Sequence, residues 1–146
     1  MTALPVLAVL AVRTGYSGRP LAKKLGIHEG CRVVLLAAPA AWADGVAPLP
    51  EAVQLQTRLS AQTDLVHLFA TQQAELARQL KHLRGSLRPD ATLWVSWPKK
   101  SAKQATDISE DSIRALALPL GFVDVKGCAV NAVWSGLKLV VRKALR

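Results

Sequence analysis

The segment Cys31–Ala38, with the sequence CRVVLLAA, decides the fold class of this chain. Apart from Arg32 it is a continuous aliphatic run, with no alternation of polar and apolar residues. Strands in the middle of a parallel sheet are buried on both faces and show runs of this kind. The segment therefore predicts a central parallel strand and an α/β protein built around it.

Strands and helices alternate downstream of this segment. Asp64–Ala70 predicts a second buried strand, and Thr71–Arg84 carries leucines at positions 76, 80 and 83, which line one face of a helix. We expect Gly85 to end that helix. Ala91–Trp97 is rich in aromatic and β-branched residues, and it predicts a third strand that Pro98 closes.

The C-terminal part predicts one more helix and a hairpin. A helix opens in Asp107–Arg114, with Ser109 as its N-cap and acidic residues in its first turn, and Gly121 ends it. Phe122–Val130 and Leu137–Arg142 predict two strands joined by a short link, most simply an antiparallel hairpin.

The first two strands are separated by little regular structure. Pro39–Pro50 holds three prolines and predicts a loop with at most one turn of helix, and Glu51–Gln62 predicts a short amphipathic helix. Upstream, Arg19–Gly26 predicts a short helix with Pro20 in its first turn and Gly26 at its C-cap. The whole order predicts an open sheet that is mostly parallel, with a C-terminal antiparallel hairpin. It resembles a truncated, Rossmann-like sheet of the methyltransferase type.

A chain of 146 residues has the size of one domain, and we place a single α/β domain at residues 15–146. Residues 1–14 form an apolar N-terminal extension or a strand. The apolar run Ala3–Val12 is too short to span a bilayer, and it lacks the basic segment and cleavage site of a secretory signal. We therefore expect a cytoplasmic protein without membrane association.

The formal net charge of +9 favours anionic partners, either a small molecule or an acidic protein. The last nine residues contain four cations, Lys138, Arg142, Lys143 and Arg146, which also allows non-specific nucleic-acid binding. No helix-turn-helix, zinc-finger or RNA-binding pattern supports that alternative. The two cysteines stand 97 positions apart and the chain has three histidines, so we expect no metal site.

The loop after the first strand, Ala37–Trp42, does not suit a nucleotide cofactor. Rossmann-like sheets hold such cofactors through glycines at this position, because glycine lets the backbone approach the ligand closely. Here the sequence is AAPAAW, without glycine, and Pro39 removes a backbone N–H donor. We therefore expect neither S-adenosylmethionine nor NAD to bind in the usual manner, and no cofactor is predicted.

Lysines follow the third strand, in the segment Trp97–Lys103 (WPKKSAK). Ligands of open α/β sheets bind just outside the carboxyl ends of the strands, where lysines can receive phosphate or carboxylate groups. The alternative is that this loop is basic only because it is solvated. Trp97 itself can stack on a ligand or close the top of the core.

Two further positions allow chemistry or packing. Asp124 and Lys126 alternate along a strand and should share a face, where they can act as an acid and base pair or point outward from an edge. Trp134 covers the end of the hairpin. His67 lies within an apolar strand and is expected to be a core histidine with its hydrogen bonds satisfied.

Four separated blocks, Tyr16–Ile27, Leu93–Lys100, Val123–Lys126 and Trp134–Lys138, resemble the bacterial family known as domain of unknown function 3052. The resemblance runs from about Gly15 to Arg142 and implies small bacterial cytoplasmic proteins without an assigned activity. Together with the strand-end argument, it marks a set of candidate ligand-binding residues: Tyr16, Ser17, Gly18, Lys23, Lys24, Trp97, Lys99, Lys100, Asp124, Lys126 and Trp134.

Three function classes remain open at this point. The first is a non-catalytic or regulatory binding domain that uses Lys99, Lys100, Lys23 and Lys24 for an anionic ligand or acidic partner. The second is a methyltransferase-like enzyme with unconventional cofactor binding, and the third is a DNA-associated regulator. An exposed edge hairpin also allows a homodimer.

Overall fold

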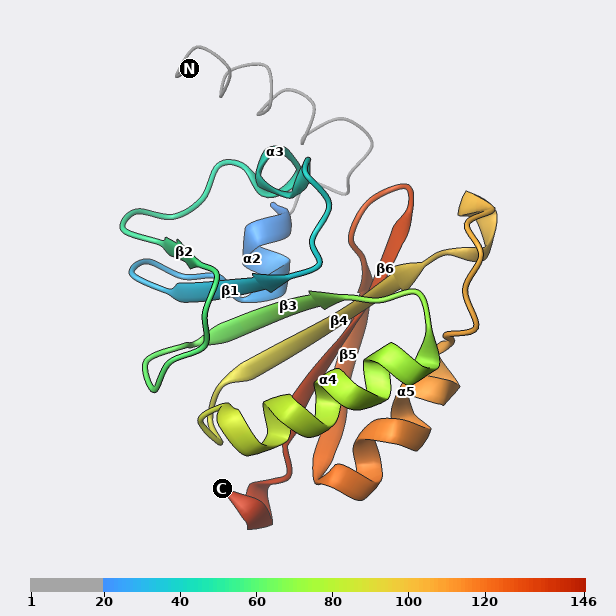
Figure 1. Ribbon diagram of the computed structural model, residues 1–146. Coiled ribbons are helices and arrows are strands. Elements are labelled where there is room, and N and C mark those ends of the chain that lie inside the picture. Colours follow the sequence, from blue (N-terminus) through green and yellow to red (C-terminus); the bar gives the residue numbers. More distant parts are fainter. Residues whose placement is uncertain (1–19) are drawn as a thin grey trace.

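The computed structural model of the chain, drawn in Figure 1, describes residues 20–146. These residues form a six-stranded sheet in the order β2-β1-β3-β4-β6-β5. The strands are β1 (Arg32–Leu36), β2 (Gln54–Gln56), β3 (Leu65–Phe69), β4 (Thr92–Pro98), β5 (Phe122–Ala129) and β6 (Trp134–Val141). Strands β1 to β4 pair in parallel, and β6 lies antiparallel between β4 and β5. The predicted sheet and hairpin are confirmed.

Helices cover both faces of this sheet, as Figure 1 shows. The helices are α2 (Leu21–Leu25), α3 (Trp42–Val46), α4 (Gln73–Ser86) and α5 (Glu110–Ala117), with short 3-10 turns η1 (Lys100–Ala102), η2 (Leu118–Leu120) and η3 (Lys143–Leu145). Helices α4 and α5 pack on one face, and α2 and α3 on the other. The residues described thus form three layers, and none of their helices is long and apolar enough to cross a bilayer.

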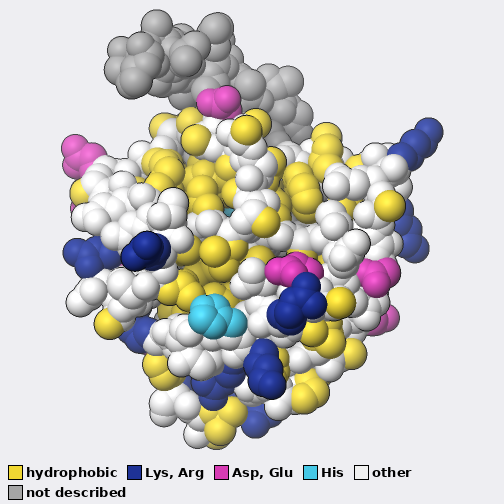
Figure 2. Space-filling view, viewed as in Figure 1, with side chains coloured by type: hydrophobic (Ala, Val, Ile, Leu, Met, Phe, Trp, Pro, Cys, Tyr) yellow, Lys and Arg dark blue, Asp and Glu magenta, His cyan; other side chains and the backbone are white. Residues whose placement is uncertain are grey.

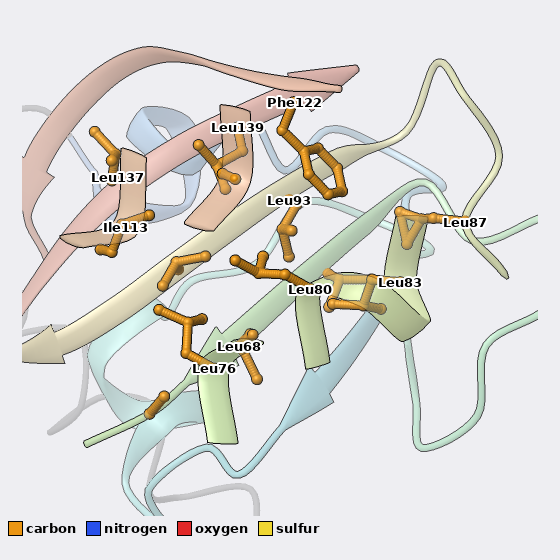
Figure 3. Packing of buried hydrophobic residues seen from close by; sticks show 14 of the residues in the cluster. Leu68, Leu76, Leu80, Leu83, Leu87, Leu93, Ile113, Phe122, Leu137 and Leu139 are labelled. Atoms are coloured by element: carbon orange, nitrogen blue, oxygen red, sulfur yellow. The ribbon is translucent and has the colours of Figure 1, made fainter. Parts of the chain in front are cut away.

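The two faces of the sheet carry separate cores. On the α4 side, Leu76, Leu80 and Leu83 are fully buried against Leu68 of β3 and Leu93 of β4 (Figure 3). A second cluster lies under α2 and α3 and includes Trp94, the largest of the fully buried side chains. Because both faces are buried, the central strands carry apolar residues on both of their sides, which explains the long apolar runs in the sequence.

The predicted helix in 51–62 is wrong, since this segment contributes β2, which pairs in parallel with β1 at the sheet edge. Only three residues of β2 pair with β1. A strand this short forms because a neighbouring strand is available, and the β-propensity of its own residues does not reveal that neighbour. Gly85 does not end α4 either, because the helix continues to Ser86 and its C-cap is the buried, extended Leu87. Gly26 does end α2 in the left-handed region, with φ of 83°, as predicted.

Asp124 and Lys126 do not share a face. Asp124 pairs with Leu139 and Lys126 with Lys138, which are consecutive residues on β6. Val125 is therefore an extra residue in a β-bulge. Alternation along a strand fails at a bulge, and the prediction of a common face is wrong for that reason.

Candidate functional site

The strand order places the crevice of this sheet between two neighbouring strands. From β1 the chain continues outward to β2, and it then returns to form β3 on the other side of β1. In open α/β sheets, ligands bind outside the carboxyl ends of strands at such a switch point. A ligand-binding site is therefore expected at the carboxyl ends of β1 and β3.

The loop after β1 leads into a side chain that packs against β3. Ala37, the first residue beyond β1, has φ of 58°, a conformation that favours glycine. The loop then enters α3, whose first residue, Trp42, is buried. The Trp42 indole Nε1 donates a hydrogen bond to His67 Nδ1 on β3, over 3.0 Å. The side chain that follows the loop thus packs inward over β3.

The hydrogen bonds of His67 fix the position of its proton. Because Trp42 Nε1 can only donate, His67 Nδ1 accepts, and Nε2 carries the proton that it donates to Ser96 Oγ over 2.7 Å. Burial lowers the pKa of His67 to about 3, so the ring is neutral near pH 7. The prediction of a satisfied core histidine is confirmed.

Aromatic rings extend this buried group toward the hairpin. The ring of Phe69 stacks on His67 with centroids 4.2 Å apart, and Trp134 meets Phe69 edge to face at 5.0 Å. One cleft at this edge has a volume of about 280 Å³, and it is lined by Ala37, Phe69, Ala70, Thr71, Gln72, Glu75 and Trp134. A second cleft shares Thr71 and Gln72 with it, continues along Ala74, Ala105, Thr106 and Asp107, and has a volume of about 420 Å³. Ligand pockets usually measure about 300–1,000 Å³, so the first cleft falls just below this range and the second lies within it.

At the N-termini of α4 and α5, side chains of the protein accept hydrogen bonds from backbone N–H groups. Gln73 N, at the start of α4, donates to Asp107 Oδ1 over 2.7 Å. Ser109 and Ser112 form a capping box at the start of α5, as the sequence predicted for Ser109. A helix N-terminus binds anions through free N–H groups, and here carboxylate and hydroxyl oxygens already accept from them. No local pattern reveals the role of Asp107, because its partner lies 34 residues away.

Three lysines follow β4 at the same edge of the sheet, and two of them are exposed to solvent. Lys99, Lys100 and Lys103 lie in and around η1, and we call Lys99–Lys103 the lysine loop. Lys100 and Lys103 are exposed and Lys99 is half-buried. The loop is anchored to the hairpin, since Lys99 N donates to Val133 O over 2.7 Å. None of the three lysines forms an ion pair with any residue in 20–146.

The two candidate tryptophans lie on opposite faces of the sheet. Trp97 pairs with Ser135 and packs, half-buried, against the core on the α4 side. Trp134 pairs with Pro98 and belongs to the other face, beside Phe69. Because they lie on opposite faces, they cannot contact one ligand from two sides. Trp97 packs as part of the hydrophobic core.

The remaining candidates are divided between separate places. Lys23 and Lys24 lie on α2, and Lys126 is exposed on the same side of the sheet. Lys24 and Lys126 both lower the pKa of the Cys128 thiol, but burial has the larger effect and raises that pKa above its ordinary value. Asp124 accepts a hydrogen bond from Arg114 Nε over 2.9 Å, and this bond holds the pKa of Asp124 below its ordinary value. Asp124 therefore ties β5 to α5.

Tyr16, Ser17, Gly18 and the apolar segment 1–14 lie outside the residues that the structure describes. Of the candidate residues, those of the lysine loop and Trp134 lie together at the carboxyl edge of the sheet. The other described candidates lie elsewhere: Lys23, Lys24, Asp124 and Lys126.

Comparison with known proteins bears on the fold alone. No family model matches the chain, and no curated protein is similar to it in sequence. Solved structures share its architecture. They include a putative type 11 methyltransferase from Sulfolobus solfataricus, which is 9% identical with a TM-score of 0.58 over 84% of this chain and 90% of that one.

Two others are S-adenosylmethionine-dependent methyltransferases. The one from Aquifex aeolicus is 13% identical with a TM-score of 0.57, over 94% of this chain and 98% of that one. The one from Clostridium acetobutylicum is 5% identical with a TM-score of 0.57, over 97% of this chain and 98% of that one. Identities this low carry no function with them. The chain has the Rossmann-like fold of methyltransferases, and the resemblance to domain of unknown function 3052 stays a prediction.

Proposed function

We propose that this protein is a non-catalytic binding domain on a methyltransferase-type fold and that it takes an anionic ligand, a small molecule or an acidic segment of a partner protein, at the lysine loop. The observation that carries the proposal is that the chain itself uses two positions where a nucleotide cofactor would bind. Trp42 packs over β3 on His67, and Asp107 Oδ1 accepts the hydrogen bond of Gln73 N at the start of α4.

The lysine loop suits an anion for two reasons. Its ammonium groups have no carboxylate partner among the residues in 20–146, so their charge is available to a ligand. The hydrogen bond from Lys99 N to Val133 O also ties the loop to the hairpin, which reduces the conformational entropy lost on binding. Lysine receives phosphate or carboxylate as a point charge, without a fixed geometry, which favours a range of anions.

Isothermal titration calorimetry with ATP, glucose 6-phosphate and a short polyglutamate tests this proposal. We expect binding by the wild type and a loss of roughly tenfold or more in affinity for Lys99→Ala/Lys100→Ala, because about 1–2 kcal/mol is lost with each charged contact. Arg58→Ala/Arg78→Ala is the matched control, with the same change in net charge at two exposed positions outside the lysine loop. Equal affinities for all three proteins would contradict the proposal.

A methyltransferase-like enzyme is the second candidate, favoured by the likeness of the fold to the S-adenosylmethionine-dependent enzymes above. It requires the cofactor to bind in an unconventional way, since the loop after β1 has no glycine and leads into Trp42, which packs over β3. Titration of S-adenosylmethionine in the same calorimeter separates the two candidates. Binding with a micromolar Kd would favour the enzyme, and no heat of binding would favour the binding domain.

A further inference from the structure

A second basic surface lies at the opposite end of the sheet from the lysine loop. It is formed by the C-terminal half of α4 and the last residues of the chain, and it comprises Lys81, Arg84, Arg142, Lys143 and Arg146, which we call the basic end. In Figure 2, dark-blue side chains gather over this lower part of the molecule. None of the five cations forms an ion pair with a residue in 20–146, the range that holds all ten acidic residues of the chain.

Backbone contacts around Gly121 bring the two parts of the basic end together. Arg142 N donates to Gly121 O over 2.8 Å, which leads the chain from β6 back beside η2. Gly121 has φ of 101°, and a β-carbon there would come within 2.7 Å of Leu145 Cδ1 and 3.1 Å of Arg84 Nε. Side chains from α4 and from the end of the chain thus meet over one glycine.

Two arginines of the basic end are held in place without being neutralised. Arg84 Nε donates to Leu120 O, and Arg146 Nε donates to Val141 O, each over 2.9 Å. Each bond uses only Nε, so the terminal nitrogens of both guanidinium groups keep their donors. By contrast, the terminal nitrogens of Arg78, Arg88 and Arg114 form ion pairs with carboxylates. A positioned guanidinium with open donors matches two oxygens of one phosphate group.

We propose that the basic end binds the phosphate backbone of double-stranded nucleic acid, without sequence specificity. Five uncompensated cations on one surface suit a regular array of phosphates, and each contact releases condensed counterions. The tryptophans of the described residues lie elsewhere, on β4, β6 and α3, so the basic end has no aromatic platform on which unstacked bases could lie. A duplex presents phosphates without needing such a platform.

Fluorescence anisotropy with a labelled DNA duplex of about 20 base pairs tests this proposal. Five phosphate contacts predict a log–log salt slope of about −4 to −5, so the association constant should fall about 10²–10³-fold between roughly 50 and 200 mM salt. The variant Lys81→Ala/Arg142→Ala/Lys143→Ala replaces exposed side chains that make no side-chain hydrogen bond within residues 20–146. We expect it to lose about tenfold or more in affinity at low salt, with a slope shallower by about 2–3.

Lys99→Ala/Lys100→Ala/Lys103→Ala is the matched control, because it removes the same charge from the lysine loop. It should keep the wild-type salt slope for the duplex and should lose affinity for ATP. The proposal for the lysine loop and the proposal for the basic end can therefore be contradicted separately. Equal weakening by both triple variants would mean that only net charge matters, and would overturn the proposal. Polyglutamate that competes as well as unlabelled duplex would overturn it too, in favour of an acidic protein.

Discussion

Lowering the pH from about 7 to about 4 should remove about 3 kcal/mol of folding free energy through one side chain, His67. In the folded chain its pKa is lowered from 6.5 to about 3 by complete burial. The unfolded chain therefore binds a proton in this window that the folded chain does not. The contribution of His67 is complete above about pH 6.5, and it is lost as the pH falls toward 3.

Urea unfolding at several pH values between about 4 and 7 measures this effect. His67→Gln cannot titrate, so its free energy of unfolding should fall less steeply with acid than that of the wild type, by about 3 kcal/mol over the range. At pH 7 the variant should be less stable, because Trp42 Nε1 and Ser96 Oγ lose a buried partner. Trp97→Phe changes no titratable group, leaves His67 and its partners in place, and should keep the wild-type slope. Parallel curves for His67→Gln and the wild type would contradict the assignment.

Trp94→Ala should cost about 3–5 kcal/mol in the free energy of unfolding, the range for truncating a large buried aromatic residue. Trp94 is fully buried on β4, and its Nε1 donates to Leu25 O over 2.8 Å. This bond fastens the end of α2 to the centre of the sheet. Trp94→Phe keeps a ring but leaves the Leu25 carbonyl without its donor, and we expect a loss of about 2 kcal/mol.

Thermal unfolding followed by circular dichroism checks both variants, with Trp97→Phe as the matched control. Trp97 lies on the same strand but is half-buried, and its indole makes no hydrogen bond within residues 20–146. Its replacement should lower Tm much less than Trp94→Phe does. Equal shifts for the two phenylalanine variants would show that the hydrogen bond to Leu25 contributes nothing.

Much of the fold was predictable because both faces of the sheet are buried. The runs at β1, β3 and β4 are apolar for that reason, and the leucines of α4 have helical spacing because the helix presents one face to the sheet. Strand β2 was missed because three paired residues at an edge leave no pattern. The bulge at Val125 was missed because a bulge depends on the partner strand.

The site was harder to predict, because its contacts join residues far apart in the sequence. The absence of glycine after β1 was visible, but not that Trp42 hydrogen-bonds to His67, 25 residues away. The contact of Arg84 was equally hidden, since its Nε donates to the carbonyl of Leu120, 36 residues away.

Part of the Trp134-Ser135-Gly136 segment serves packing. A β-carbon on Gly136 would lie 3.1 Å from Val130 Cγ2 and 3.3 Å from Trp94 Cε3, so this position leaves room for the buried indole. Trp134 meanwhile packs against Phe69. These contacts account for both residues without a ligand, and they leave the lysine loop as the part of the carboxyl edge most available to one.

We expect anions to bind at the lysine loop while Trp42 stays packed over β3 and the crevice between β1 and β3 takes no cofactor. Amide and indole chemical shifts from ¹H–¹⁵N NMR test it most directly, in separate titrations with ATP and S-adenosylmethionine. With ATP, the amides of Lys99–Lys103 and Val133 should shift, and with either ligand the Trp42 indole and the Ala37 amide should stay in place. Shifts of the Trp42 indole and the Ala37 amide on addition of S-adenosylmethionine, with none in the lysine loop on addition of ATP, would contradict the claim.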